Sequence, residues 1–157
     1  MSSKRTVVAI MVMMFALITA RPLRAASGDA CSLLTQAQVS AVLGVPVDTG
    51  KRVIPNSTLM CGWSEHGGPT AISKRVVLTL STPEKFTRGK TPFQGITKVP
   101  VSGIGDDAYF VTASGLGTTL NVLKGSSAFA VSVKGQFSAD KVKEFEKGLA
   151  QNVLSRL

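Results

Sequence analysis

Histidine and cysteine are scarce in this chain, and their scarcity limits the chemistry that it can carry out. The 157 residues hold one His, His66, and two Cys, Cys31 and Cys61. A structural zinc site needs about four Cys or His ligands, so these residues are too few for one. No CxxC pair is present either, which argues against a thiol redox centre. We therefore expect neither a metal nor a cofactor.

Acidic and aromatic residues are also few, and internal repeats are missing. Nine Asp and Glu stand against 18 Lys and Arg, a formal net charge of +9, and aromatic residues make up 6% of the chain. Proteins that bind single-stranded nucleic acid interleave basic residues with aromatic ones that stack on bases, so we expect no nucleic acid partner. The length and the absence of repeats exclude a two-domain enzyme and a solenoid.

The start of the chain has the pattern of a secretory signal. Lys4 and Arg5 precede an uncharged apolar run at 6–20, and small residues follow, with cleavage expected after Ala25. The run is shorter than the roughly 20 residues that a bilayer-crossing helix needs. Basic residues after the run, Arg21 and Arg24, oppose translocation, so a retained anchor stays open as an alternative.

We accordingly predict a signal peptide at 1–25 and a single exported domain at 26–157, located in the periplasm or secreted. A lipid anchor on Cys31 is disfavoured, because the residues before it do not form a lipobox next to the apolar run. Loss of the segment removes four basic residues and no acidic one, so the net charge falls from +9 to +5. Membrane contact is then expected only through an uncleaved signal segment.

The two cysteines fit an exported chain. Disulfides persist in oxidising compartments, so we expect one bond between Cys31 and Cys61. The bond closes a loop of about 30 residues and is worth about 3–4 kcal/mol in the chain-entropy model.

Hydrophobic periodicity predicts an α+β domain. A short helix is expected at 32–44, because Thr35 and Gln38 form a capping box and Gly44 supplies a stop. Apolar residues at three- or four-residue spacing predict a long C-terminal helix from Ser138. Alternation predicts an antiparallel sheet of about five strands, covered by the two helices, with strands at 60–65, 75–81, 107–112, 118–124 and 128–134.

The segment at 82–102 holds three Pro and two Gly and is expected to be a loop with one helical turn at 83–87. Long loops inside compact domains are often functional. Basic residues gather in and before this segment, against Glu84 alone, and such a surface attracts anionic lipid, polymers or acidic proteins. The candidate binding surface consists of Lys74, Arg75, Lys85, Arg88, Lys90 and Lys98, with Lys51 and Arg52 expected nearby.

Several short motifs occur together in one order. They are Ala30-Cys31-Ser32-Leu33-Leu34-Thr35, then 39–44, then Cys61-Gly62-Trp63, then Gly103-Ile104-Gly105-Asp106-Asp107-Ala108-Tyr109, before the C-terminal helix. This order, over roughly 29–155, resembles a family of bacterial exported domains of unknown function whose members are often lipoproteins. The resemblance implies a Cys31–Cys61 disulfide and a sheet-and-helix fold, with no established activity and no catalytic residue. The chain departs from the family by lacking a lipobox.

The glycine motif at 103–108 matches the letters of a dinucleotide fingerprint, but that chemistry requires a helix to follow it. Here a strand is expected to follow, so we interpret the motif as a turn. Asp106 and Asp107 are candidate ligand contacts, although neighbouring residues on a strand point to opposite faces. Trp63, the only Trp, is a third candidate contact, with packing against the disulfide as the alternative.

Two further patterns could mark a nucleophile. Ser138 and Lys141 have the S-x-x-K spacing of serine acyl-transfer enzymes, but the companion motifs are missing and helix capping explains Ser138. Ser64 and His66 lie on one face of a strand without a G-x-S-x-G motif. We therefore predict a domain that is not an enzyme and that binds an envelope protein or an anionic envelope component. A small hydrolase or transferase and an accessory subunit of an envelope complex, marked by an exposed apolar patch, are the alternatives.

Overall fold

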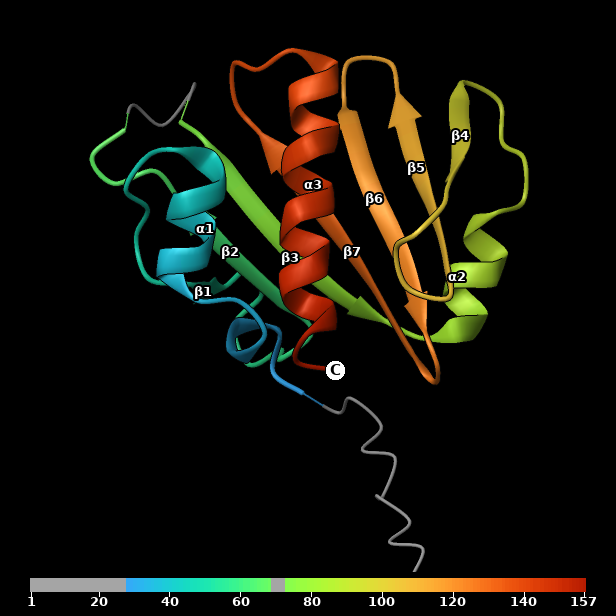
Figure 1. The fold of residues 1–157 in the computed structure, drawn as a ribbon, viewed down its shortest axis with the longest axis horizontal. Coiled ribbons are helices and arrows are strands. Elements are labelled where there is room, and N and C mark those ends of the chain that lie inside the picture. The colour runs from blue at the N-terminus through green and yellow to red at the C-terminus, as the bar shows by residue number, and fades with distance from the viewer. Residues whose placement is uncertain (1–27, 69–72) are drawn as a thin grey trace, which may run out of the picture.

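Residues 28–68 and 73–157 are described by a computed structural model, which arranges them around one antiparallel sheet (Figure 1). The predicted signal segment lies outside the described residues. The elements follow the order η1 (Ala30–Ser32), α1 (Gln36–Leu43), β1 (Lys51–Arg52), β2 (Met60–Ser64), β3 (Arg75–Ser81), α2 (Pro83–Gly89), β4 (Ile96–Val101), β5 (Asp107–Ala113), β6 (Gly117–Lys124), β7 (Ser127–Lys134) and α3 (Ala139–Leu154).

The α+β class is confirmed, with a larger sheet than expected. The sheet has seven strands in the order β1-β2-β3-β7-β6-β5-β4, all antiparallel to their neighbours. The five predicted strands are present, and β1 and β4 are added at the two edges. The segment at 82–102 is therefore not a loop, because its first part forms α2 and its last part forms β4.

The local signals at the helix ends act as the sequence predicts. Thr35 accepts a hydrogen bond from the Gln38 N–H, and the Gln38 side chain accepts one from the Thr35 N–H, which completes the capping box. Gly44 ends α1 in the left-handed conformation, with φ of 68°. Ser138 caps α3 by accepting a hydrogen bond from the Lys141 N–H.

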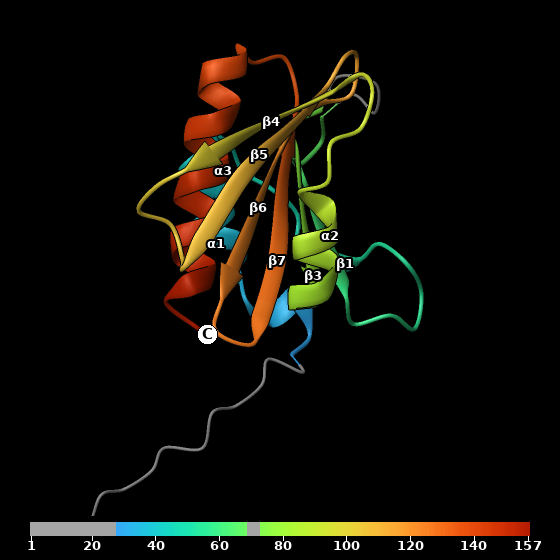
Figure 2. The same ribbon diagram turned by 90° about the vertical axis from the view of Figure 1, so that its right-hand side faces the viewer.

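One face of the sheet is covered by α1 and α3, and the core lies between them (Figure 2). α3 buries Val142, Leu149, Ala150 and Val153 against alternate residues of the strands, which is the amphipathic pattern that the sequence predicts. The disulfide between Cys31 and Cys61 joins η1 to β2 within this core. The predicted covalent link is therefore present and holds the start of the domain against the sheet.

The opposite face of the sheet is covered at one end only, by α2, and we call it the open face (Figure 2). Phe86 of α2 packs there against Tyr109 and Ala128, and the Tyr109 hydroxyl donates a 3.0 Å hydrogen bond to the Phe86 carbonyl. Burial beneath α2 raises the pKa of Tyr109, and the nearby Asp107 carboxylate adds to this effect. The centre of the open face carries small or half-buried side chains from β3, β6 and β7, namely Val77, Thr79, Thr119, Asn121, Ala130 and Ser132.

Candidate functional site

Ion pairs divide the basic residues of the domain into two groups. Arg52, Lys90, Lys124, Lys141 and Lys143 each lie within 4.0 Å of a carboxylate oxygen. The other basic side chains of residues 28–68 and 73–157 have no carboxylate within that distance. They are Lys51, Lys74, Arg75, Lys85, Arg88, Lys98, Lys134, Lys147 and Arg156.

Strand register places four of these residues without a carboxylate partner on the open face. Paired residues on neighbouring strands share a face, and successive residues alternate between faces. Arg75 and Lys134 therefore point away from the buried Val76 and Val133. Lys98 pairs with Val111, which alternates with the buried Phe110, and Lys51 pairs with Gly62, which alternates with the buried Cys61.

Arg75 and Lys134 form a like-charged pair at the top of the open face. The two residues are direct partners in the ladder between β3 and β7, and both are exposed. Their charged ends diverge, because a guanidinium nitrogen of Arg75 lies 3.5 Å from the position of a Cβ at Gly62 in β2, whereas the Lys134 Nζ donates to the Leu116 carbonyl beside β6. Neither cation has a carboxylate within 4.0 Å in the described part of the chain. Both charges are therefore left without a neutralising partner on this face.

The helix α2 adds two more cations without a carboxylate partner on the same side. Lys85 and Arg88 are exposed on α2, which begins at the Thr82 cap and is held to the sheet by Phe86. We call the six residues of this side the basic face. They are Lys51, Arg75, Lys85, Arg88, Lys98 and Lys134.

Shallow cavities lie among these cations. One has a volume of about 280 Å³ and lies over β1, β2 and β3, with Lys51 and Arg75 in its lining beside Ser64. A second, of about 210 Å³, lies between α2 and the sheet, where Lys85 and Lys98 flank Asn121. A third, of about 190 Å³, also includes Lys98. Lys98 therefore reaches two cavities from its position at the sheet edge.

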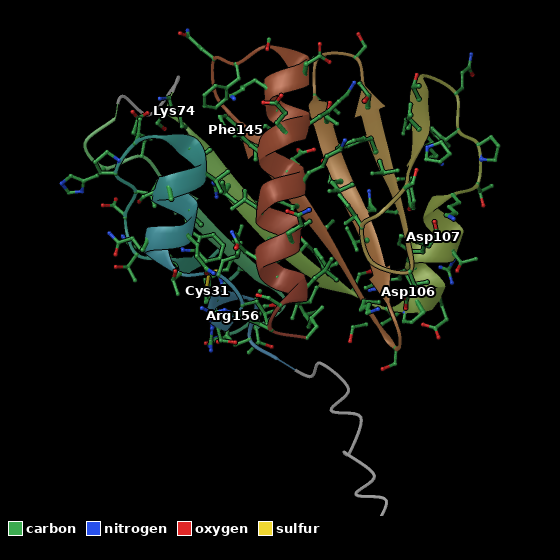
Figure 3. All side chains as sticks on the ribbon, viewed as in Figure 1. Cys31, Lys74, Asp106, Asp107, Phe145 and Arg156 are labelled. Atoms are coloured by element: carbon green, nitrogen blue, oxygen red, sulfur yellow. A yellow bond between two sulfur atoms is a disulfide. The ribbon has the colours of Figure 1, made fainter. Side chains whose placement is uncertain are left out.

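Two of the sequence-predicted basic residues do not belong to this group. Lys74 does not lie on the open face. Its Nζ is 5.5 Å from the centre of the ring of Phe137, a residue that packs against the core on the other side of the sheet. Lys90 is ion-paired with Asp107 and lies 5.2 Å from the centre of the Phe86 ring. Figure 3 places Lys74 and Asp107 at opposite ends of the sheet. The structure instead brings Lys134 beside Arg75, a residue that the sequence grouping missed.

The two neighbouring aspartates have separate lysine partners. Asp106 accepts hydrogen bonds from the Lys124 Nζ and from the Gly125 N–H, both at 2.7 Å, and these bonds lower its pKa. Asp107 lies on the open face with Lys90. The preceding glycines, Gly103 and Gly105, have φ of 78° and 62° and lead into β5. The motif is thus a turn before a strand, as predicted, and the two carboxylates do not form one site.

The remaining sequence candidates do not assemble a nucleophile. The Nδ1 atom of His66 lies 2.6 Å from Oδ1 of Asp48, and the hydrogen bond from His66 lowers the pKa of Asp48. No hydrogen bond joins Ser64 to His66 in the part of the chain that the structure describes. Ser138 is occupied as the cap of α3. Neither pattern therefore places a base beside an activated hydroxyl.

The structure does not support the proposed ligand contact through Trp63. This residue is 1% exposed, on the side of the sheet that faces the core. A Cβ added to Gly50 would lie 2.6 Å from Cε2 of Trp63 and 2.9 Å from Sγ of Cys61. The backbone at Gly50 therefore closes directly over the ring and the disulfide, and packing explains Trp63.

One buried carboxyl group was not anticipated from the sequence. Glu146 of α3 is 0% exposed, and its Oε1 accepts a 3.1 Å hydrogen bond from the Val133 N–H. The pairing of β6 with β7 stops at Leu120 and Val131, so Glu146 takes the place of a strand partner for Val133. Burial raises the pKa of Glu146 to about 8, against the opposing effects of this hydrogen bond and Lys134. Its second oxygen has no hydrogen-bond partner among the residues that the structure describes.

Comparison with family models, curated proteins and solved structures finds no match to this chain. Within the described ranges, no helix is long and apolar enough to cross a membrane. The same ranges hold no group of three or more His, Cys, Asp or Glu that could bind a metal ion.

Proposed function

We propose that this chain is an exported domain that binds an anionic component of the cell envelope through its basic face, without catalysing a reaction. The observation that carries the proposal is the group of six basic side chains without a carboxylate within 4.0 Å, on the sheet face that α2 covers only in part. An anionic ligand on this face would supply the opposite charge that these side chains lack. The disulfide supports the exported, periplasmic or secreted location.

The distribution of charge also supports this choice of surface. Of the nine basic side chains without a nearby carboxylate, six belong to the basic face. The acidic residues on this side in the described chain include Asp107, which is paired with Lys90, Glu84 of α2, and Asp48, which lines the cavity with Lys51 and Arg75. Positive charge is therefore in excess on this face, and such an excess concentrates oppositely charged ligands, whatever their detailed shape.

The proposal favours a binding domain over an enzyme, because the candidate nucleophiles and carboxylates are separated. The two aspartates have separate partners, since Asp106 is paired with Lys124 and Asp107 with Lys90. His66 contacts Asp48, and no hydrogen bond joins it to Ser64 in the described residues. The resemblance to bacterial exported domains agrees with this proposal, since it implies no established activity.

A matched pair of variants tests the surface. The test variant is Arg75→Gln, Lys98→Gln and Lys134→Gln, and the control is Lys141→Gln, Lys143→Gln and Lys147→Gln on α3. Both lose three charges, but only the first loses them from the basic face. A basic residue beside an anionic surface contributes about 1 kcal/mol, so the test variant should lose about a hundredfold in affinity.

The measurement is co-sedimentation with envelope fragments at increasing salt concentration. The control should bind nearly as well as the parent chain, and the parent's affinity should fall as salt screens the charges. Equal losses in the two variants would show that net charge alone matters and would rule out the proposed surface.

A further inference from the structure

Apolar side chains are exposed around the basic face. Phe93 and Leu116 are 70% and 71% exposed, and Ile54 and Leu59 are 52% and 51% exposed. Val53 is exposed to a smaller extent, at 36%. These residues lie in the β1–β2 loop (53–59), the α2–β4 loop (90–95) and the β5–β6 turn (114–116). They account for five of the seven large apolar residues that are exposed in the described chain.

Contacts place all three loops on the side of the basic face. Cγ2 of Val53 lies 3.2 Å from the position of a Cβ at Gly62, and a guanidinium nitrogen of Arg75 lies 3.5 Å from the same position. The Lys98 Nζ donates to the Thr91 carbonyl in the α2–β4 loop. The Lys134 Nζ donates to the Leu116 carbonyl in the β5–β6 turn. Each apolar loop is therefore joined to a cation of the basic face.

The loops also lie at different corners of the face. Phe93 and Leu116 lie near the end of the sheet where Ile96 pairs with Ala113, whereas the β1–β2 loop enters β2 where Met60 pairs with Thr79, at the other end. Figure 2 shows the β1–β2 loop extending to the same side of the sheet as α2. The exposed apolar residues therefore form separate tips, each near a cation of the basic face, rather than one continuous apolar patch.

We infer that the basic face docks on the surface of an anionic lipid bilayer. The cations lie among the headgroups, while Val53, Ile54, Leu59, Phe93 and Leu116 enter the boundary with the acyl chains. Peripheral membrane binding combines these two contributions, apolar burial and attraction to anionic lipid. This inference rests on the proposed function and specifies its ligand. It departs from the expectation that only an uncleaved signal segment would touch the membrane.

A soluble polyanion would explain the charges but not the apolar tips. Apolar side chains gain free energy only when they leave water, and a phosphate polymer offers no apolar surface to receive them. An acidic protein partner would be expected to cover one contiguous patch, with its apolar residues central and its charges at the rim. Here the exposed apolar residues instead lie in three separate loops and form no contiguous patch in the described chain.

The experiment compares two sets of apolar substitutions in the chain as it is recovered from its host. The test variant is Ile54→Ser, Phe93→Ser and Leu116→Ser, with one change in each loop. The control is Val99→Ser and Leu157→Ser, which changes the other two exposed apolar residues, at 47% and 38% exposure. Val99 pairs with the buried Phe110 and so faces away from the basic face. All chains have the same N-terminus, so any binding by the residues at 6–20 is common to them.

Binding is measured to vesicles of equal phosphatidylglycerol and phosphatidylcholine, to vesicles of phosphatidylcholine alone, and to inorganic polyphosphate. We expect the parent chain to prefer the anionic vesicles. The test variant should lose at least about tenfold in vesicle affinity while keeping its affinity for polyphosphate. The control should stay within about twofold of the parent, and equal melting temperatures would show that all chains fold.

Vesicle binding by the test variant at the parent's strength would overturn the lipid inference. Binding of the parent to envelope fragments and polyphosphate but not to vesicles would also overturn it, while the proposed function would stand. If the variant with Arg75→Gln, Lys98→Gln and Lys134→Gln bound every probe as the parent does, both proposals would fail.

Discussion

At the residue scale, Glu146 shows how one side chain compensates for an interruption in the sheet. Where β6 and β7 separate, the Val133 N–H would lack a partner, and Oε1 of Glu146 accepts its hydrogen bond. A buried carboxyl group avoids charge unless a partner stabilises the charged form, which is why its pKa rises to about 8. This role was not predictable from sequence, because Glu146 lies among exposed charged residues of a helix.

The raised pKa makes stability depend on pH. Between the ordinary value of 4.5 and about 8, the folded chain keeps the proton that the unfolded chain releases. The unfolded state therefore binds fewer protons in this window, and the free energy of unfolding falls as the pH rises. The contribution of Glu146 is fully present below about pH 4.5 and is lost by about pH 8. We expect urea unfolding to show this decline in the parent chain.

Glu146→Gln should flatten that decline, since glutamine has no proton to lose. The matched control is Glu144→Gln, which changes an exposed carboxylate two residues away on the same helix. Its pH profile should follow the parent's between pH 5 and 9. A decline of the same size in Glu146→Gln would assign the pH dependence to another group.

At the element scale, the disulfide attaches η1 and the start of α1 to the sheet. Its two cysteines are 30 residues apart, and β1 lies in the loop that it closes. A two-residue strand at the edge has little pairing of its own. We therefore expect the covalent bond to hold this end of the domain together.

Cys31→Ser with Cys61→Ser should lower the free energy of unfolding by about 3–4 kcal/mol. Chemical denaturation with and without reductant measures the effect. Reductant should bring the parent close to the double variant and leave the double variant unchanged. A parent chain that is equally stable with and without reductant, with its thiols shown to be reduced, would contradict this prediction.

The elements that the sequence predicted are those with a repeated local signal. Alternating apolar residues identified β2, β3, β5, β6 and β7, and capping residues identified α1 and α3. β4 was missed because Pro100 and the exposed Thr97 and Val99 interrupt the pattern of a half-buried strand. Proline is tolerated there because an edge strand has one side without a partner. β1 is too short to leave any periodic signal.

The candidate site was predictable in the same partial way. Basic residues close together in the chain, Lys85, Arg88 and Lys98, could be grouped from the sequence. Lys134 could not, because its place beside Arg75 depends on the pairing of β3 with β7, two strands that are far apart in the sequence. Composition indicated a basic protein, but only the strand register showed which cations share a face.

At the scale of the whole molecule, stability should decrease from the centre of the sheet toward its edges. β3, β7 and β6 each have strands on both sides, and β6 and β7 also pack against α3, whereas β1 and β4 have one neighbour each. Segments with few buried contacts open locally at a lower free energy. We expect hydrogen exchange to be slowest in β3 and β7 and at least about tenfold faster in β4. Equal protection of β4 and β7 would show that the sheet opens only as a unit.

The two edge strands limit how this protein can recognise a partner and how that recognition can evolve. β1 spans two residues, and β4 carries Pro100 and Lys98, features that discourage another chain from extending the sheet. A partner is thereby denied the main-chain hydrogen bonds that strand addition relies on and must be recognised through side chains. Substitutions on the open face can then alter what is bound while the backbone stays the same. The scaffold and its specificity are separable, so closely related chains with this fold can differ in ligand.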